Sequence, residues 1–436
     1  MKVFKFGGAS VKDAEAVKNI AKILRNYSSD NLVVVVSAMG KTTNALEKVV
    51  NAWRAKNPEL SECTRVVANY HETIATELFP DSNHPIHADL RTLFGQLQAI
   101  LDNDRTENFD YAYDQVVSFG ELFSTAIVHH FLQSAGFNSN LYDARKLIRT
   151  DSTYRDGKVN WAATAILINK TLLPLFALPQ KQIVLTQGFI GSCSEGYTTT
   201  LGREGSDYSA AIFAYTLEAQ EMIIWKDVPG LLNADPKYFS ITEKLNSISY
   251  REAIELSYYG ATIIHPNTIK PLQNKNIPLR VKSFINPEDE GSLIYHDGSN
   301  DSLIPSFIFK VNQTLLSISP RDFSFIDELN LSEILGIFAR LNIHIHLMQN
   351  SALSFSVCID THELRLKQLF EELVQKFKLR YNTGLELITI RHYDQATIDR
   401  VLMDDKTVLL DMRTRHTAQL VVRPAVINNS ISDVKE

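Results

Sequence analysis

The sequence is poor in cysteine, has no long apolar run and carries no excess of basic residues. Its three cysteines, Cys63, Cys193 and Cys358, are widely spaced and form no CxxC pair or His/Cys cluster, which excludes a disulfide framework and a structural zinc site. The N-terminus MKVFKFGGAS lacks the apolar region of a signal peptide, and no apolar stretch reaches about 18 residues. We therefore expect a cytoplasmic protein with no export signal and no membrane span.

The charge balance narrows the choice of partners. The 436 residues include 44 Lys and Arg against 50 Asp and Glu, a formal net charge of −6 at pH 7. This balance offers no basic surface for a phosphate backbone, so nucleic acid is not an expected partner. Hydrophobic residues make up 44% and charged residues 22%, which is ordinary globular usage. The length suggests about two to three domains, and small ligands are the expected partners.

Residues 2 to about 294 alternate between short β-branched runs and longer helical periodicities. This pattern predicts an α/β fold, a mostly parallel sheet with helices on both faces. We expect a first strand at 3–6, a helix at 11–27 and a strand at 32–36 that is buried on both faces because its apolar run is unbroken. Further strands are expected at 182–188, 222–225 and 278–281, and further helices at 206–217 and 250–258.

Turn-forming and acidic residues crowd the window 286–301, so we place a domain boundary there, with a first domain at 1–296 and a second at 297–436. For the second part, the sequence predicts two adjacent strands (307–311 and 314–318), a helix at 325–341, two strands at 343–348 and 353–359, and a helix at 363–377. This order of strands and helices then repeats in shortened form, with a strand at 385–390, a helix at 396–402, and strands at 408–412 and 418–422. This order predicts tandem small α+β modules.

The first candidate site is Lys5-Phe6-Gly7-Gly8-Ala9-Ser10, where a strand ends in two glycines before a helix. Glycines let backbone N–H groups approach an anion closely, a helix N-terminus adds partial positive charge, and Lys5 adds a full one. The segment therefore suits a phosphate. A purely structural Gly-Gly turn explains it equally well.

The second candidate is the hydroxyl-rich loop that follows strand 32–36, from Ser37 through Gly40-Lys41-Thr42 to Thr43-Asn44. A Walker A loop needs a glycine five residues before Gly40, and Val35 stands there, so a P-loop is excluded. A loop at the carboxyl end of a parallel strand is where open α/β sheets bind ligands. The alternative is a helix N-cap formed by Ser37 or Thr42.

The third candidate is Glu121 in the segment SFGELFST, where a charged residue opens an apolar helix. One interpretation is a solvated first-turn glutamate stabilised by the helix dipole. The other is an anion that binds a substrate ammonium group.

The fourth candidate is the densest, TTTLGREGSDYSA, with Arg203 between glycines and Ser206-Asp207 at the start of a helix. An arginine in such a turn can bind a carboxylate or phosphate through two hydrogen bonds. The alternative is a capped helix beside a polar hairpin loop.

The motifs KFGGAS, the hydroxyl loop, SFGE, LGREGSDYSA, DVPG…ADP, GATIIHP and VKS occur in an order that resembles the aspartate kinases of the amino acid kinase superfamily. The repeated α+β tail resembles the ACT regulatory modules of that family. The resemblance implies an amino acid kinase fold followed by tandem ACT modules, the second one shortened. It also implies ATP-dependent phosphorylation of the β-carboxylate of L-aspartate, the first step of lysine, threonine, methionine and diaminopimelate biosynthesis, with Mg²⁺ as cofactor.

By motif position, the resemblance implies a role for each residue. Lys5 bridges the β- and γ-phosphates, Gly7 and Gly8 offer backbone donors, and Asp207 orients Lys5. Arg203 binds a substrate carboxylate and Glu121 the α-ammonium group. The residues that hydrogen-bond substrate oxygens are Ser37, Thr43 and Ser206, and those that line the nucleotide site are Asp227, Lys237 and Lys282. A carboxylate nucleophile is already ionised near pH 7, so the reaction requires no general base.

Some positions depart from the family. Glu204 stands where glycine or asparagine is common, and one interpretation is that it points to solvent. Lys226 replaces a usual threonine, and Leu232 a common tyrosine. Two acidic positions that could hold an effector ammonium group in the tail are His346 and Ala352 here, so we expect weak or no inhibition by lysine or threonine.

The family resemblance also implies a homodimer formed through the ACT modules, or a higher oligomer, although a tail that serves mainly as a dimerisation surface without an effector is an equal alternative. The end of the sequence at Glu436 leaves no room for a homoserine dehydrogenase domain, so a monofunctional enzyme is expected. Two other functions stay open, an amino acid kinase with a different carboxylate substrate and an amino-acid-sensing ACT protein whose kinase domain has decayed.

Overall fold

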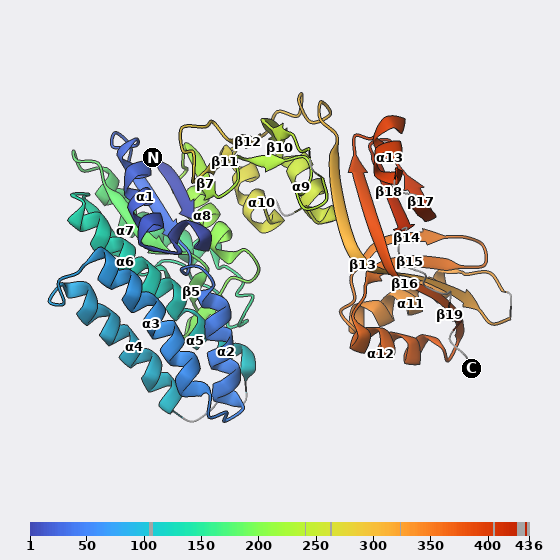
Figure 1. The fold of residues 1–436 in the computed structure, drawn as a ribbon, viewed down its shortest axis with the longest axis horizontal. Coiled ribbons are helices and arrows are strands. Elements are labelled where there is room, and N and C mark those ends of the chain that lie inside the picture. Colours follow the sequence, from blue (N-terminus) through green and yellow to red (C-terminus); the bar gives the residue numbers. More distant parts are fainter. Residues whose placement is uncertain are drawn as a thin grey trace. The chain divides into compact units, whose positions relative to one another are not determined.

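The structure, a computed structural model, describes residues 1–103, 108–239, 241–261, 264–322, 324–403 and 406–424, and the backbone of 432–433. The chain divides into two compact units (Figure 1). The first unit comprises Met1–Leu231, Lys244–Ile254 and Ile263–Ser299, and the second comprises Leu232–Glu243, Glu255–Thr262 and Asn300–Glu436. No described helix is both long and apolar enough to cross a membrane.

The first unit is built on an eight-stranded sheet in the order β10-β12-β11-β7-β1-β2-β4-β3. In that order, the strands are Ser247–Ser249, Ser292–Tyr295, Leu279–Ser283, Glu221–Lys226, Lys2–Phe6, Leu32–Val36, Ile183–Gln187 and Ser139–Tyr142. Only the β11–β12 pair among these neighbours is antiparallel. The predicted mostly parallel sheet is therefore confirmed.

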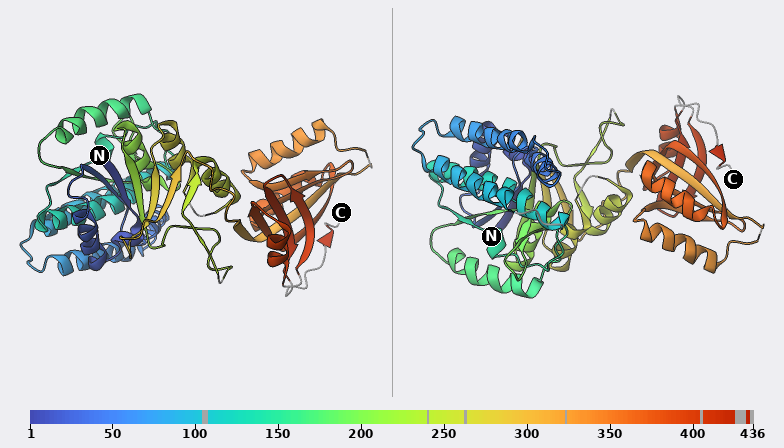
Figure 2. Two further views of the ribbon diagram at one scale, coloured as in Figure 1. Left: turned by 90° about the horizontal axis from the view of Figure 1, so that it is seen from above. Right: turned by 90° about the horizontal axis from the view of Figure 1, so that it is seen from below.

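Helices cover both faces of this sheet (Figure 2). On one face α1 (Ala14–Arg25) and α6 (Phe119–Ser134) share a core with alternate side chains of β1 and β2, and on the other face α8 (Gly205–Thr216) packs against β1, β2 and β7. Every residue of β2 is buried, as its unbroken apolar run predicts. The other helices of this unit are α2 (Thr42–Arg54), α3 (Leu60–Leu78), α4 (Pro85–Asp102), α5 (Phe109–Val117), α7 (Trp161–Phe176) and α10 (Pro266–Asn274), while α9 (Tyr250–Tyr259) crosses the division between the units.

The first helix begins later than its periodicity predicts. Residues Gly8–Val11 form a 3₁₀ turn, and Asp13 then caps α1 by accepting a hydrogen bond from the Ala16 N–H (2.8 Å). An Asp at the N-cap satisfies a backbone donor that has no partner within the helix. The chain therefore makes a short turn directly after the two glycines, before the regular helix starts.

The second unit contains an antiparallel sheet in the order β14-β15-β13-β16-β18-β17, with β19 pairing beside β16. In chain order, the strands are β13 (Ser306–Pro320), β14 (Ile345–Asn350), β15 (Phe355–Asp360), β16 (Phe377–Arg391), β17 (Thr407–Arg413), β18 (Thr417–Arg423) and β19 (Ser432–Asp433). Helices α11 (Glu328–Arg340) and α12 (Glu363–Leu373) share one apolar core with this sheet, and α13 (Gln395–Leu402) shares another. This arrangement is consistent with two ACT modules.

Two predicted boundaries in this unit are wrong. The expected strands 307–311 and 314–318 are one strand, β13, whose register against β16 shifts between Lys310 and Gln313. Asn312 lies in that shift at φ +55°, so its bulge has the appearance of a turn in the sequence. The expected helix 363–377 ends at Leu373, and β16 starts at Phe377. Because β13 and β16 are each 15 residues long, the two modules share one sheet.

Candidate functional site

The carboxyl ends of β1, β2, β4 and β7 meet at one edge of the parallel sheet, where a cavity of about 350 Å³ lies. The strand ends, the first turn of α6 and the turn before α8 supply its walls. The lining residues are Lys5, Gly8, Ser37, Ala38, Gly40, Thr43, Glu121, Phe189, Gly202, Glu204, Gly205, Ser206, Asp207 and Lys226. The structure thus gathers Lys5, Gly8, Ser37, Thr43, Glu121, Ser206 and Asp207 from the predicted site residues into one place.

An ion pair lies at the centre of this wall. The Lys5 Nζ is 2.6 Å from the Asp207 Oδ1, and both side chains are buried. Lys5 comes from β1 and Asp207 from the first turn of α8, so the pair joins the sheet to the helix that covers it. The predicted contact of Asp207 with Lys5 is present, which gives the ammonium group a fixed position.

The two glycines after β1 are closely packed, and at Gly8 the packing leaves no room for a side chain. A Cβ on Gly8 would lie 2.9 Å from both the Ala38 O and the Gly40 O, and a Cβ on Gly7 would lie 3.3 Å from the Lys5 Nζ. The Gly40 N–H also donates to the Gly8 O (3.0 Å). The glycine turn and the hydroxyl loop therefore form one surface, because no side chain separates them.

The capping alternative for the hydroxyl loop is wrong. Helix α2 begins at Thr42, its N-cap is Lys41, and no side chain accepts a capping hydrogen bond there. The Thr42 Oγ1 instead donates to the Met39 O (2.6 Å), while Ser37 and Thr43 line the cavity. Gly40 takes the left-handed φ of +54°, which lets the loop turn sharply toward Gly8.

Glu121 is the most unusual group in the cavity. Its side chain is 2% exposed, so the alternative of a solvated first-turn glutamate is wrong. The Oε1 accepts a hydrogen bond from the Ala38 N–H (3.2 Å), whereas the buried Oε2 has no hydrogen-bond partner among the described residues. Burial raises the pKa of Glu121 to about 8, although the Ala38 N–H and nearby Lys5 act in the opposite direction. A buried oxygen that lacks a donor is expected to receive one from a ligand.

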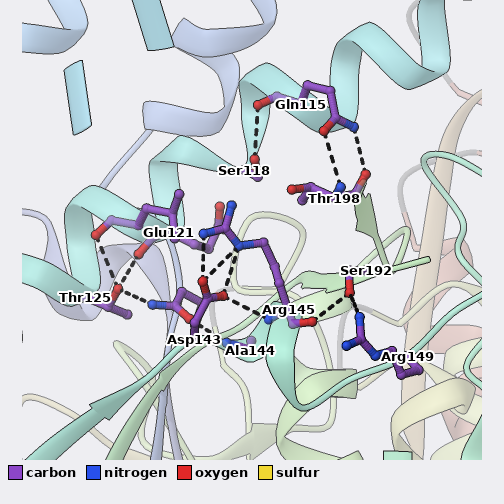
Figure 3. A network of polar contacts seen from close by, with 12 residues as sticks. Gln115, Ser118, Glu121, Thr125, Asp143, Ala144, Arg145, Arg149, Ser192 and Thr198 are labelled. Carbon is purple, nitrogen blue, oxygen red and sulfur yellow. Dashed lines mark hydrogen bonds and ion pairs between the residues drawn. The ribbon is translucent and has the colours of Figure 1, made fainter. Parts of the chain in front are cut away.

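A chain of hydrogen bonds holds the start of α6 in place (Figure 3). The Thr125 Oγ1 donates to the Glu121 backbone O (2.8 Å) and accepts from the Gln187 Nε2 (2.8 Å). The Gln187 Oε1 in turn accepts from the Ala144 N–H (2.8 Å). Glu121 is thereby tied to β4, one of the strands whose ends form the cavity.

The turn from 201 to 205, which we call the arginine turn, lies between β6 (Thr198–Thr200) and α8. Gly202 and Glu204 have φ values of +76° and +54°. The Glu204 N-cap makes no side-chain capping bond, and Asp207 pairs with Lys5, so the interpretation of a simply capped helix is wrong. The solvent-facing interpretation of Glu204 is also wrong, because this side chain lines the cavity and accepts from the His265 N–H (2.9 Å).

The buried Asp114 on α5 anchors the strand that enters this turn. It accepts hydrogen bonds from the Thr200 N–H (2.9 Å), the Thr200 Oγ1 (2.7 Å) and the Arg155 N–H (3.0 Å). Burial raises the pKa of Asp114 to about 6 despite these donors. Gln115 adds two hydrogen bonds to the backbone of Thr198 (2.8 and 3.2 Å), as Figure 3 shows.

The remaining predicted residues do not line the cavity. Arg203 is exposed between two lining residues and makes no hydrogen bond or ion pair with any described residue. Asp227 is exposed directly after β7, and the Lys282 Nζ lies 5.4 Å from the centre of the Trp225 ring. Burial lowers the pKa of Lys282. Lys237 belongs to the second unit, where its backbone N–H donates to Asp235 (2.9 Å).

Sequence reasoning named Lys226 only as a departure from the family, without a role in the site, and did not name Phe189. Lys226 ends β7 and presents a second lysine to the cavity, and Phe189 follows β4. The signal for Lys226 was its position at the carboxyl end of a parallel strand. Phe189 has a φ of +68°, which no local sequence pattern predicts.

The chain is similar to known proteins over most of its length. Residues 1–283 match the model of the amino acid kinase family. The lysine-sensitive aspartokinase 3 of Escherichia coli K12 is 32% identical over 396 residues, which cover 89% of this chain and 86% of that protein. Aspartokinase 1 of Arabidopsis thaliana is 31% identical, with 85% of this chain and 65% of that protein covered.

Solved structures of an aspartokinase are also similar to this chain. The crystal structure of E. coli aspartokinase III in complex with aspartate and ADP has a TM-score of 0.80 and 29% sequence identity, with 97% of this chain and 96% of that chain covered. The complex of the same enzyme with lysine and aspartate has a TM-score of 0.80 and 28% identity over the same shares. The likeness therefore extends through both compact units.

Proposed function

Because the chain belongs to the aspartokinases of the amino acid kinase family, we propose that its cavity holds ATP beside L-aspartate and transfers the γ-phosphoryl group to the aspartate β-carboxylate. The product is 4-phospho-L-aspartate. The E. coli relative was solved with aspartate and ADP, which supports an amino acid and a nucleotide in neighbouring positions. The observation that carries the proposal is the buried Glu121 Oε2 without a donor, in the same cavity as the Lys5–Asp207 pair.

Glu121 suits the α-ammonium group of an amino acid. An ammonium group has three N–H donors and a positive charge, so it satisfies the Glu121 Oε2 and stabilises the ionised carboxylate. Arg203, which has no partner among the described residues, binds the α-carboxylate of the substrate from the edge of the cavity. The hydroxyl groups of Ser37, Thr43 and Ser206 then hydrogen-bond the remaining substrate oxygens.

Lys5 suits the phosphates. In phosphoryl transfer, negative charge spreads over the transferred group and the leaving oxygen, and the protein acts mainly by alignment and charge stabilisation. Lys5 bridges the β- and γ-phosphates, Asp207 fixes its direction, and Gly7 and Gly8 offer backbone donors. Asp227, Lys237 and Lys282 contact the nucleotide. The β-carboxylate of aspartate is ionised at neutral pH and attacks without a general base.

We also propose Mg²⁺ as a cofactor. The described residues contain no group of three or more His, Cys, Asp or Glu side chains that could hold a metal ion. Phosphate oxygens, which are the hard ligands that Mg²⁺ prefers, would therefore hold most of it, with Asp207, the partner of Lys5, as a carboxylate ligand from the cavity wall. When bound, the ion offsets phosphate charge.

The proposed catalytic domain is 1–296 and the proposed regulatory tail is 297–436, with a homodimer formed through the ACT modules and a cytoplasmic location.

Within the second unit, β14 is a terminal strand of the sheet, and Met348 on it is exposed. A terminal strand can pair with a second copy of the same strand. Sedimentation velocity of the full chain separates a dimer from a higher oligomer and from a monomer.

The test of the function is an assay of acyl phosphate trapped with hydroxylamine. We expect hydroxamate and ADP in equal amounts with L-aspartate and MgATP. Product with glutamate or N-acetylglutamate instead would identify a different amino acid kinase. Amino acid binding to the full chain without turnover would identify a sensor with a decayed kinase domain, and either result would overturn the proposal.

Arg203→Ala is expected to raise the KM for aspartate by about 10²-fold and to change the KM for ATP little, because a lost charge-assisted pair with a substrate carboxylate weakens binding of that substrate alone. Steady-state kinetics with each substrate varied in turn measures the two constants. Arg65→Ala removes a surface arginine that pairs with Glu62 on α3 and serves as the control. An equal rise of both KM values would contradict the assignment of Arg203 to aspartate.

Lysine and threonine, singly and together at millimolar concentration, are expected to change the rate by less than about 2-fold, because an effector without differential binding shifts no equilibrium. The reason is the environment of His346, which is 2.9 Å from the Lys310 Nζ and 3.0 Å from Asp360. An imidazole is neutral or positive, so the ring offers no counter-charge to an ammonium group, and burial and the charge of Lys310 lower the pKa of His346. Strong inhibition by either amino acid in steady-state assays would defeat this expectation.

A further inference from the structure

Glu204 has an unusual backbone for a residue with a side chain. Its φ and ψ are 54° and 29°, in the left-handed region, and Gly202 two residues earlier is also left-handed. Residues other than glycine adopt this conformation at a cost in free energy, and such strain persists where surrounding contacts hold it. Here the Glu204 O accepts hydrogen bonds from the Asp207 N–H (3.0 Å) and the Tyr208 N–H (3.2 Å). The strained residue therefore starts α8.

The Glu204 side chain makes a hydrogen bond with a residue that is distant in the sequence. Its Oε2 accepts a hydrogen bond from the His265 N–H at 2.9 Å. His265 is the N-cap of α10, and its Nδ1 accepts from the Asn267 N–H (3.2 Å). Since α10 packs against α8, the hydrogen bond joins the start of one helix to the start of its neighbour. The arginine turn is thus attached at its Glu204 end to a second, independent segment.

The hydrogen bond to His265 also bears on whether the Glu204 carboxylate pairs with the neighbouring Arg203. Glu204 follows Arg203 directly, and a carboxylate that pairs with the guanidinium would compete with a substrate carboxylate. The guanidinium makes no hydrogen bond or ion pair with any described residue, whereas the carboxylate binds a backbone N–H. The two neighbouring charged groups therefore do not pair with each other, and the Glu204 carboxylate is held by a backbone donor instead.

We propose that Glu204 is a positioning residue for aspartate binding. By accepting the His265 N–H, it fixes the arginine turn against the start of α10 and keeps its own carboxylate away from Arg203. The inference rests on the proposed function, in which Arg203 binds the substrate. It also gives a function to His265, whose backbone N–H supplies the donor.

Three variants test the proposal. Glu204→Gly removes the acceptor and tolerates the left-handed backbone, so folding is not impaired. Glu204→Gln removes the charge and keeps an oxygen that accepts from the His265 N–H. Glu218→Gly is the matched control, because Glu218, just after the end of α8, is also a left-handed glutamate (φ 51°), and its ion pair with Lys275 (2.7 Å) reaches the C-terminal end of α10.

The expected result is a rise of about 10-fold in the KM for aspartate in Glu204→Gly, with kcat and the KM for ATP changed by less than about 2-fold. Glu204→Gln and Glu218→Gly are expected to stay within about 2-fold of the parent enzyme in all three constants. Hydrogen exchange adds a readout that needs no turnover. The His265 amide is expected to exchange faster in Glu204→Gly than in the parent chain and to stay protected in Glu204→Gln.

Four outcomes would overturn the proposal: an unchanged KM for aspartate in Glu204→Gly, a loss in Glu204→Gln as large as in Glu204→Gly, an equal effect of Glu218→Gly, or unchanged exchange of the His265 amide. Failure of the proposed function is recognised separately, because the parent chain itself would then form no aspartyl hydroxamate.

Discussion

Lys5→Met is expected to lower kcat for aspartyl phosphate formation by about 10³-fold, with the KM for aspartate changed much less. The ammonium group lies 2.6 Å from Asp207 in a buried position at the cavity wall. A charge held there stabilises the phosphoryl group most strongly when its negative charge develops, so its loss acts on turnover more than on substrate binding. Steady-state kinetics with saturating MgATP measures the effect.

Lys2→Met is the matched control for that experiment. Lys2 lies on the same strand and also pairs with an aspartate, Asp30 at 2.8 Å, but both side chains are about a quarter exposed and neither lines the cavity. A partly exposed pair contributes about 0–1 kcal/mol to stability. Lys2→Met should therefore retain the parent rate, and a Lys5→Met enzyme with undiminished turnover would refute the assigned role.

Glu121→Gln is expected to lower kcat/KM for aspartate by about 10²–10³-fold, because the amide leaves a buried ammonium group without its opposite charge. The KM for ATP should change little. Glu47→Gln is the control, since Glu47 on α2 accepts a hydrogen bond from the Tyr113 OH (2.9 Å), is half-buried and lies outside the cavity lining. A Glu121→Gln enzyme with the parent kcat/KM would contradict the ammonium site.

The pH dependence gives a second test of Glu121. Burial raises the pKa of this group to about 8, so below that pH the free enzyme holds a carboxylic acid, whereas an ammonium ligand requires the carboxylate. Binding of aspartate must then release a proton. In the parent enzyme kcat/KM for aspartate is expected to rise between pH of about 6 and 8 and to level off above it, and Glu121→Gln should remove this rise.

The sequence predicts most of the fold because its periodicities are strong. The unbroken LVVVV run gives β2 its correct bounds, 32–36, and parallel strands place their loops at one edge. That rule alone brings the glycine turn and the hydroxyl loop together. The continuous strand β13 escaped prediction because the left-handed Asn312 in its bulge has the local chemistry of a turn.

The electrostatics of the site depend on distant partners and could not be predicted from local pattern. Asp207 pairs with a lysine near the N-terminus, and Glu204 bonds to a backbone amide at 265. Glu121 is buried because every residue of its helix from Phe119 to Val128 is buried in the folded chain, which overrides the usual preference of a first-turn glutamate for solvent. Each of these outcomes is a tertiary contact, so only the folded chain reveals it.

The first strand of the chain lies in the interior of its sheet, between β2 and β7. During synthesis, β1 leaves the ribosome long before Glu221–Lys226 exists to pair with it. Until β7 is synthesised, one backbone edge of the apolar strand β1 has no pairing strand. Lys5 also lacks its ion-pair partner until Asp207 is synthesised. Nascent chains that stop before α8 should therefore engage chaperones or aggregate, whereas release beyond β7 permits closure of the sheet.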